Sequence, residues 1–537
     1  MQPIGRRMFV GSVVAGSLGF FATRSIRASD ARIEILINEP INTISREIYG
    51  HFIEHLGGVI YDGVWVGEKS KVPNIGGIRR DLIEYMRKIK PGVLRWPGGC
   101  FADSYDWRDG IGPRQNRPQR TNFWINENGN QNSPLAYDNN NFGTNEFLRF
   151  CKLIGAQPYI AANVRSLTAK DFYQWVEYCN SPIGMTTLSK MREAGGDREP
   201  FNVHYWGVGN EGWGCGGDMT PDEYADEFKK FAAWVPSYST RPALIAAGPS
   251  SGDTRWTRGF FSRLTERSEG ELGRLYGWAL HHYSGSTGKR DPFEFTQDEW
   301  YELLGRADRM DTLITTHWSI MGEIDKTRRV KLIVDEWGAW HHREPDMPEK
   351  YLWAYSGTLR DALVSALTLD TFNRHADKVV VANVAQLVNT IHSLFIARED
   401  KFLATANYYV FDMYSAHQGA QSVRTVFSAP TVDYKIGDKT NSLWGLAGSA
   451  SLKDKQLVLT VVNPHHDQPR NTEIAIRGAA IKSGQSRTLT STDLHAHNGF
   501  EHSRALEPKD ATLTTSGSVI VYQFPAASIT RLMFDVG

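Results

Sequence analysis

Short apolar runs alternate with amphipathic segments through most of the chain. Eight such runs end in polar or glycine residues: 47–52, 92–96, 157–162, 203–208, 243–247, 278–282, 330–334 and 378–384. Between them, apolar residues recur at the three-to-four-residue spacing of a helix with one buried face. Such helices are expected at 79–90, 145–153, 168–178, 222–235, 298–324, 358–375 and 404–417. This alternation predicts an α/β fold, a (β/α)8 TIM barrel over residues 46–418.

The pattern changes after residue 418. Short alternating strands separated by turns are expected at 431–435, 442–448, 456–462, 472–476, 486–489 and 518–524. This pattern is typical of an all-β sandwich, which we place at residues 419–537. Residues 30–45 hold one more strand, at 32–37, which we expect to join the C-terminal β-sandwich.

The first 29 residues have the layout of an export signal. Arg6 and Arg7 precede a modest apolar run, 8–22, which is too short to span a membrane. The paired arginines and the Gly- and Ser-diluted run resemble a twin-arginine signal, which exports folded protein. An ordinary signal peptide is the alternative. We therefore expect a periplasmic or secreted protein that has no membrane contact once the signal is removed.

Composition excludes some classes of function. The 60 Lys and Arg residues balance the 60 Asp and Glu residues, so nucleic-acid binding through bulk charge is not expected. Aromatic residues make up 12% of the chain, a content that suits sugar stacking as well as core packing. Four cysteines in 537 residues exclude a disulfide scaffold. They need not pair, and Cys151 and Cys179 lie on predicted helices, where we expect buried free thiols.

Two glutamates follow the fourth and seventh predicted strands. Glu211 comes after the run 203–208, and Glu336 comes after 330–334. These strands lie across a barrel from each other, so both carboxylates can project over its mouth. Glycoside hydrolysis uses such a pair, with a separation of about 5–5.5 Å in retaining enzymes and about 6.5–9.5 Å in inverting ones. Asp335 is the nearest competitor for the role of Glu336, but successive residues of a regular strand face opposite ways.

The adjacent histidines His281-His282 and His341-His342 do not have the spacing of a metal site. Neighbouring residues of a strand point apart, and neither an HExxH motif nor a zinc-type Cys/His pattern occurs. We expect no catalytic metal and no cofactor. Gly98-Gly99 is not a phosphate loop, because no Lys-Ser/Thr pair and helix follow it.

Six motifs resemble glycoside hydrolase family 51, the α-L-arabinofuranosidases. In the family's order they are YGHFIEHLG (49–57), LRWPGGCF (94–101), WRDGIGP (107–113), GVGNE (207–211), DEW (335–337) and NVAQLVN (383–389). The resemblance covers about residues 46–420. It implies a retaining enzyme that removes arabinofuranose side groups from plant arabinan or arabinoxylan, and a homo-oligomer, often a hexamer.

The resemblance also implies roles for the central polar residues. Glu211 is similar to the family's general acid/base, and Glu336 is similar to its nucleophile. Asn210 matches the residue that hydrogen-bonds the sugar 2-hydroxyl, a contact that can strengthen in the transition state.

Five further residues are expected around the sugar. Glu54 and Cys100 match family positions that line the furanose pocket. Arg95 is expected to pair with Glu336 and keep it ionised. Tyr283 is expected to orient the nucleophile, and Gln386 to reach the far hydroxyls of the sugar.

A long polar segment, 114–141, is rich in Asn and Gln and is expected to form a loop on the active-site face. Trp124 within it is either a sugar platform or a hydrophobic pin. The part from 122 to 141 looks longer than the family's usual connection, and bacterial members usually lack an export signal. The longer segment bears on which polymer the enzyme prefers, and the export signal bears on its location.

Three alternative functions stay open at the level of sequence. The family also includes endo-acting β-glucanases, and a galactofuranosidase would use the same carboxylate pair. Glu54, Cys100 and Gln386 together favour a furanose pocket. A carbohydrate-binding barrel without catalysis is the third alternative, which the presence of both carboxylates disfavours.

Overall fold

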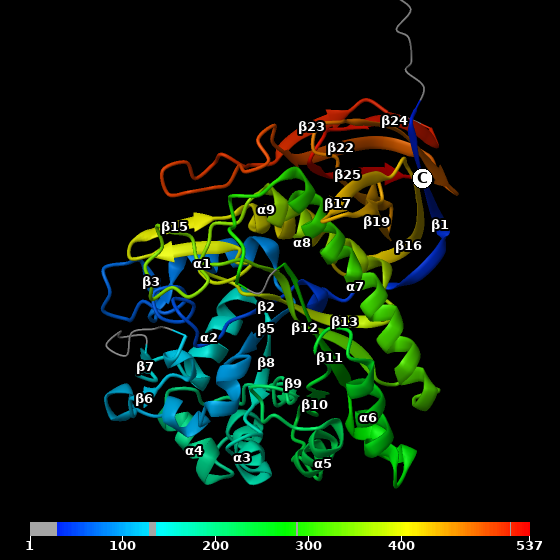
Figure 1. Cartoon of the computed structure of the whole chain (residues 1–537). Coiled ribbons are helices and arrows are strands. Elements are labelled where there is room, and N and C mark those ends of the chain that lie inside the picture. Colours follow the sequence, from blue (N-terminus) through cyan, green and yellow to red (C-terminus); the bar gives the residue numbers. More distant parts are fainter. Residues whose placement is uncertain (1–28, 128–135, 286–287, 516) are drawn as a thin grey trace, which may run out of the picture.

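Eight parallel strands close into a barrel in the computed structural model, which describes residues 29–127, 136–285, 288–515 and 517–537 (Figure 1). Around the barrel they are β2 (Gly50–Phe52), β5 (Val93–Trp96), β8 (Gln157–Ala162), β9 (Tyr205–Val208), β10 (Ala243–Ala246), β11 (Gly277–Gly285), β12 (Lys331–Trp340) and β13 (Val379–Ala385). Each predicted strand overlaps one of them, so the predicted barrel is confirmed. The proposed export signal, apart from its last residue, lies outside the described residues.

Helices cover the outside of the barrel. They are α1 (Arg80–Ile89), α2 (Thr144–Ile154), α3 (Ala169–Asn180), α4 (Thr187–Ala194), α5 (Pro221–Ala232), α6 (Thr254–Thr265), α7 (Gln297–Ile324), α8 (Leu359–Arg374) and α9 (Ala406–Tyr414). Helix α6 was not among the expected helices, although Trp256, Phe260 and Leu264 repeat at the four-residue spacing of a buried face. No helix in the described ranges combines the length and the apolarity needed to cross a bilayer.

The C-terminal part forms a sandwich-like domain. Its main sheet, among the described residues, has the order β23-β22-β25-β20-β19-β16-β1-β21-β24. The strands are β1 (Ala31–Thr43), β16 (Gln421–Ser428), β19 (Ala447–Lys453), β20 (Gln456–Asn463), β21 (Arg470–Arg477), β22 (Ile481–Thr490), β23 (Lys509–Leu513), β24 (Val519–Phe524) and β25 (Ser528–Val536). The N-terminal strand β1 pairs antiparallel with β16 and parallel with β21, so it belongs to this sheet as expected.

Four two-stranded antiparallel sheets complete the described strands. They are β3 (Asn74–Ile75) with β4 (Ile78–Arg79), β6 (Arg120–Thr121) with β7 (Tyr137–Asp138), β14 (Phe395–Arg398) with β15 (Lys401–Ala404), and β17 (Val432–Ile436) with β18 (Lys439–Leu443). The β6–β7 pair belongs to the long polar segment that was expected on the active-site face.

Helix α8 lies between the barrel and the sandwich (Figure 1). It is buried along almost its whole length, as expected of a helix that is covered on both sides. Asp370 on this helix accepts hydrogen bonds from the hydroxyls of Tyr414, Ser449 and Thr460. Burial raises the pKa of Asp370 to about 6. This carboxyl therefore joins the two domains through a buried polar cluster.

Replacing Asp370 by alanine should lower the free energy of unfolding by about 3 kcal/mol, because three buried hydroxyls lose their acceptor. Urea unfolding followed by tryptophan fluorescence measures the change. Asp377→Ala, at a more exposed carboxylate that pairs with Lys378, is the control and should change little. Equal unfolding midpoints for the two variants would contradict a joining role for Asp370.

Candidate active site

Glu336 lies on β12 at a β-bulge. The pairing of β11 with β12 skips Asp335, so the regular alternation of faces is broken there. As a result both carboxylates reach Arg95: its Nη1 lies 2.8 Å from Glu336 Oε1, and its Nε lies 3.8 Å from Asp335 Oδ2. The expectation that Asp335 faces away from Glu336 was therefore wrong. The hydroxyl of Tyr159 donates to Asp335 at 2.7 Å and holds this carboxylate inside the barrel.

The surroundings of Glu336 favour its ionised form. Arg95 donates to Oε1, and the hydroxyl of Tyr283 donates to Oε2 at 2.7 Å. Burial raises the pKa of Glu336, but the positive charges of His281 and Arg95 and these two hydrogen bonds outweigh it, so the pKa lies below its ordinary value. Burial and the nearby Glu336 raise the pKa of Tyr283 well above its usual range, which keeps the phenol protonated as a donor. A buried, ionised carboxylate of this kind is suited to nucleophilic attack.

Glu211 stands at the start of a tight loop after β9. Its backbone φ is +42°, a left-handed conformation that is costly for a residue with a Cβ and that is often found at functional sites. The loop is compact: a Cβ on Gly216 would come within 1.7 Å of the carbonyl oxygen of Asn210, so only glycine fits there. The backbone thus aims the Glu211 side chain into the barrel mouth.

His281 on β11 lies between the two glutamates. Its Nδ1 is 2.9 Å from Glu211 Oε1 and 3.6 Å from Glu336 Oε2. Burial lowers the pKa of His281, but the carboxylates of Glu336 and Glu211 outweigh it and raise the pKa above its ordinary value. Because the pair His281-His282 suggested at most a metal site, the position of His281 between the two carboxylates was not predicted. Its position two residues before Tyr283, and hence on the same strand face, is the signal that points to the site.

Glu54 follows β2 and is held at both oxygens. Oε1 accepts from the backbone N–H of Phe101 at 2.9 Å and from the indole of Trp124 at 3.2 Å, and Oε2 accepts from the amide of Gln386 at 3.2 Å. Burial and the charge of Glu336 raise the pKa of Glu54 to about 8. At neutral pH this carboxyl is therefore mostly protonated and able to donate to a hydroxyl. Gln386, expected to reach the sugar, is used by both ends of its amide to hold Glu54.

Gly99 lets the backbone approach these carboxylates closely. A Cβ at this position would lie 2.9 Å from Oε1 of Glu336 and 3.4 Å from Oε2 of Glu54. The glycine therefore leaves room between the two acidic side chains.

Hydrogen bonds hold Asn210 at its side-chain carbonyl oxygen and at its backbone N–H. Its Oδ1 accepts from Arg95 at 2.6 Å, and its N–H donates to Oδ2 of Asp103 at 3.0 Å. Asp103 also accepts from the N–H of Val164 at 2.8 Å. This buried carboxylate, which positions Asn210, was not predicted from the sequence. The Nδ2 group of Asn210 has a sulfur of Cys215 at 3.7 Å, a weak partner, so it is available to a sugar hydroxyl.

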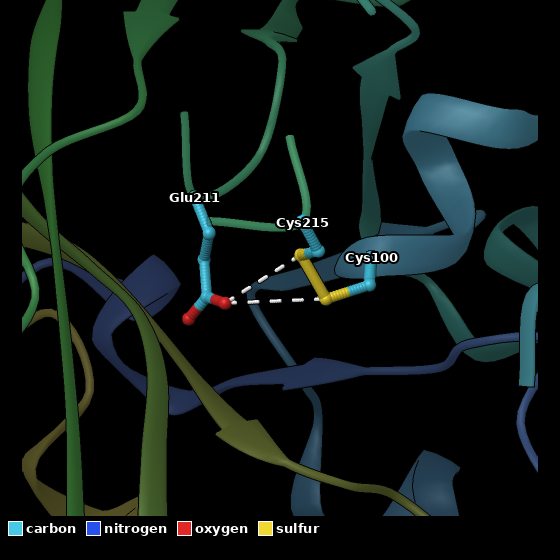
Figure 2. A group of neighbouring side chains, drawn as sticks. All are labelled: Cys100, Glu211 and Cys215. Atoms are coloured by element: carbon cyan, nitrogen blue, oxygen red, sulfur yellow. Dashed lines mark hydrogen bonds between the residues drawn. A yellow bond between two sulfur atoms is a disulfide. The ribbon is translucent and has the colours of Figure 1, made fainter. Parts of the chain in front are cut away.

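Cys100 is joined to Cys215 by a disulfide. The bond ties the loop after Glu211 to the 3-10 turn Cys100–Ser104 that follows β5. Figure 2 shows both sulfurs beside the Glu211 carboxylate. The two cysteines are 115 residues apart, and only barrel closure brings them together, so no spacing in the sequence indicates the bond. Cys151 and Cys179 are buried free thiols, as expected.

A chain of aromatic side chains runs from Glu54 to Glu336. It starts at Trp124, which donates to Glu54, and continues through Trp353 and Trp340 to Tyr283, which donates to Glu336. The ring centroids in this chain lie 5.7, 5.0 and 4.9 Å apart, with tilted or edge-to-face geometry. The polar segment 114–141 thus contributes Trp124 to the site, while residues 128–135 of that segment lie outside the described residues.

The structure brings together the eight residues that the sequence selects. Arg95 is hydrogen-bonded to Glu336 and Asn210, Tyr283 is hydrogen-bonded to Glu336, and His281 lies between Glu336 and Glu211. Glu54 and Gln386 form a hydrogen-bonded pair, which is linked to Glu336 through the charge interaction between Glu54 and Glu336. Cys100 adjoins Glu211 through its sulfur. The site is rich in carboxylates and their donors, which suits acid/base and nucleophilic chemistry on a sugar.

Comparison with known proteins also indicates an enzyme that acts on sugars. Two family models match the chain, "Alpha-L-arabinofuranosidase 1 domain" over residues 85–293 and "Alpha-L-arabinofuranosidase C-terminal domain" over residues 335–528. The structure of the GH51 arabinofuranosidase from Xanthomonas axonopodis pv. citri has a TM-score of 0.87 and 33% identity, covering 94% of this chain and 100% of that one. A relative from Bacteroides ovatus, named "Intracellular exo-alpha-L-arabinofuranosidase", is 34% identical over 97% of both chains.

The chain belongs to glycoside hydrolase family 51. It is an α-L-arabinofuranosidase, as the sequence motifs imply. Another relative, from Bacillus subtilis, is named "Intracellular exo-alpha-(1->5)-L-arabinofuranosidase 1" and is 28% identical over 93% of this chain and 97% of its own length. The names of these two arabinofuranosidases contradict the predicted periplasmic or secreted location, so that prediction was wrong. Paired arginines before a short apolar run are a weak signal, because basic and apolar residues occur together in many N-termini.

Proposed function

We propose that this arabinofuranosidase releases terminal arabinofuranose by a retaining double displacement, with Glu336 as nucleophile and Glu211 as general acid/base. The observation that carries the proposal is the spacing of the two carboxylates. Facing oxygens of Glu211 and Glu336 lie within 4.8 Å of each other, with His281 between them. Such close oxygens support the shorter carboxyl separation of retaining enzymes, about 5–5.5 Å, over that of inverting enzymes, about 6.5–9.5 Å.

In the first half-reaction, a Glu336 oxygen attacks the anomeric carbon while Glu211 donates its proton to the departing oxygen. The aglycone leaves and a glycosyl ester of Glu336 forms. In the second half-reaction, Glu211 takes a proton from water, the water oxygen attacks the anomeric carbon, and the ester bond breaks. Two inversions give net retention. Arg95 and Tyr283 stabilise the carboxylate that leaves, and Asn210 offers its amide to the 2-hydroxyl.

The proposed substrates are short arabinose-containing fragments of plant arabinan or arabinoxylan. Two observations support exo action on fragments. The first is a row of packed aromatic rings, from Trp124 to Tyr283, that connects Glu54 to Glu336. The relatives carry "exo" and "intracellular" in their names, and an enzyme inside the cell meets oligosaccharides instead of intact polymers.

A panel of aryl glycosides tests the substrate. We expect rapid hydrolysis of the α-L-arabinofuranoside and much slower hydrolysis of the galactofuranoside, xyloside, glucoside and cellobioside. Gln386 and Trp124 hold the Glu54 carboxyl in one position, so a sugar whose hydroxyls do not match that position loses a hydrogen bond, and this lowers the rate. A preference for the cellobioside would favour an endo-β-glucanase, and a preference for the galactofuranoside would favour a galactofuranosidase.

Tyr283→Phe should move the acid limb of the pH profile. Glu336 must be ionised to attack, and its low pKa keeps it ionised until the pH falls through that pKa. Without the phenol hydrogen bond the pKa rises, so activity is lost at a pH about one unit higher than in the wild type. The measurement is kcat/KM against pH with a nitrophenyl arabinofuranoside. A uniform loss of rate with an unchanged acid limb would show that Tyr283 acts only in packing.

A further inference from the structure

The disulfide sulfurs and the Glu211 carboxylate lie close together at the barrel mouth. The Cys215 sulfur lies 3.6 Å and the Cys100 sulfur 3.9 Å from the same oxygen, Oε2 of Glu211 (Figure 2). One potential ligand atom from each of the three side chains lies within 4.8 Å of the others. The other oxygen of Glu211 is occupied by His281, so Oε2 is the oxygen that faces the sulfurs.

In the disulfide the sulfurs carry neither a proton nor a full negative charge, so they are poor ligands. As two thiolates they would be strong ligands for zinc, which prefers sulfur, nitrogen and carboxylate oxygen in tetrahedral geometry. Zinc with sulfur at about 2.3 Å and oxygen at about 2.0–2.2 Å places these atoms about 3.5–3.7 Å apart. The sulfur-to-oxygen distances of 3.6 and 3.9 Å in this structure are close to that. Only the two sulfurs must move apart, to about 3.8 Å, by rotation about their Cα–Cβ bonds.

We propose that the reduced Cys100–Cys215 pair and Glu211 form an inhibitory site for a zinc-class divalent cation, and that disulfide formation closes this site. A dithiol reduces the disulfide by exchange: the two cysteines become thiols, and the dithiol becomes its own disulfide. Zinc then binds the two sulfurs and Glu211, and the two thiol protons are released. The open fourth position of a three-ligand zinc is filled by water.

Inhibition follows from the place of Glu211 in the reaction. A glutamate oxygen bound to zinc holds no proton for the leaving group, and the ion stands where that group departs. This step rests on the proposed function, whereas the metal binding does not. Disulfides are rare inside cells, so an intracellular enzyme would have the pair reduced and sensitive to zinc, and oxidation would protect it. This ion would inhibit and would take no catalytic part, so the proposal is compatible with the expectation of no catalytic metal.

Metal binding is tested first, without activity. The wild-type enzyme is reduced with a dithiol, desalted without oxygen, dialysed against micromolar zinc and analysed for bound metal. We expect about one zinc ion per chain in the reduced wild type, and almost none in the oxidised wild type, in Cys215→Ser or in Cys100→Ser. The oxidised wild type is a matched control, because it has the same buried Cys151 and Cys179. Equal zinc content in all four samples, or none in the reduced wild type, would overturn the proposal.

Inhibition is tested next on the same samples with a nitrophenyl arabinofuranoside. Zinc should slow the reduced wild type about tenfold or more at saturation, a chelator should restore its rate, and the oxidised wild type should keep its rate. Each cysteine variant is compared with its own rate without zinc and should show little further loss. Equal inhibition of reduced and oxidised enzyme would overturn the proposal. Zinc bound to the reduced pair without any loss of rate would refute the inhibitory role and would count against Glu211 as the acid/base.

Discussion

Glu336→Gln is expected to lower kcat by about 10⁴–10⁶-fold, which is the size of the loss when other covalent catalysts are deprived of their nucleophile. The amide keeps the size of the side chain but cannot form the glycosyl ester. Because this step fails for every substrate, aryl arabinofuranosides with good and with poor leaving groups should lose rate alike. Steady-state rates for a series of nitrophenyl and phenyl arabinofuranosides measure the effect. Glu323→Gln, an exposed residue on α7 that pairs with Arg258, is the control and should retain full activity.

Azide gives a second test of the same residue. In Glu336→Ala the space of the carboxylate is open, so azide can attack the anomeric carbon from the nucleophile's side. Any product should be a glycosyl azide of inverted configuration, as seen by proton NMR. An azide of retained configuration, or a loss restricted to poor leaving groups, would show that Glu336 is not the nucleophile.

Glu211→Ala is expected to have a large effect that depends on the leaving group. Without the acid, a poor leaving group must depart unprotonated, and general acid catalysis of this kind contributes about 10²–10⁴-fold. An activated dinitrophenyl arabinofuranoside needs little protonation, so formation of its glycosyl-enzyme should be nearly normal. Presteady-state measurement should show a burst followed by slow turnover, because the water in the second step lacks its base.

Azide should rescue this variant, since azide needs no general base. It attacks the glycosyl-enzyme from the side of the missing carboxylate, and the product should be a glycosyl azide of retained configuration. Equal losses for good and poor leaving groups, with no azide product, would remove Glu211 from the acid/base role. The opposite azide products of the two alanine variants therefore separate the two glutamates.

The barrel and most of the site could be predicted because the patterns that indicate them lie within short stretches of the sequence. Parallel barrel strands are buried on both faces and appear as apolar runs, and residues just after such runs lie at the active-site end. Glu211 and Glu336 are placed by that rule, and the resemblance to family 51 adds Asn210 and Arg95.

Features that depend on register or on distant contacts could not be predicted. The bulge at Asp335 changes which carboxylates face Arg95, and strand alternation cannot reveal it. The disulfide joins the loops after β5 and β9, which are far apart in the sequence. Gln386 holds Glu54 with both ends of its amide, a pairing that only three-dimensional proximity determines; its expected contact with the sugar stays a prediction.

The most direct test of the central claim is identification of the residue that carries the sugar. A mechanism-based furanosyl inhibitor, trapped on the wild-type enzyme and followed by proteolysis and tandem mass spectrometry, shows which carboxylate forms the ester. We predict one labelled peptide that contains Val334, Asp335, Glu336 and Trp337, with the label on Glu336. A label on Asp335, which also contacts Arg95, or on Glu54 would contradict the proposed mechanism.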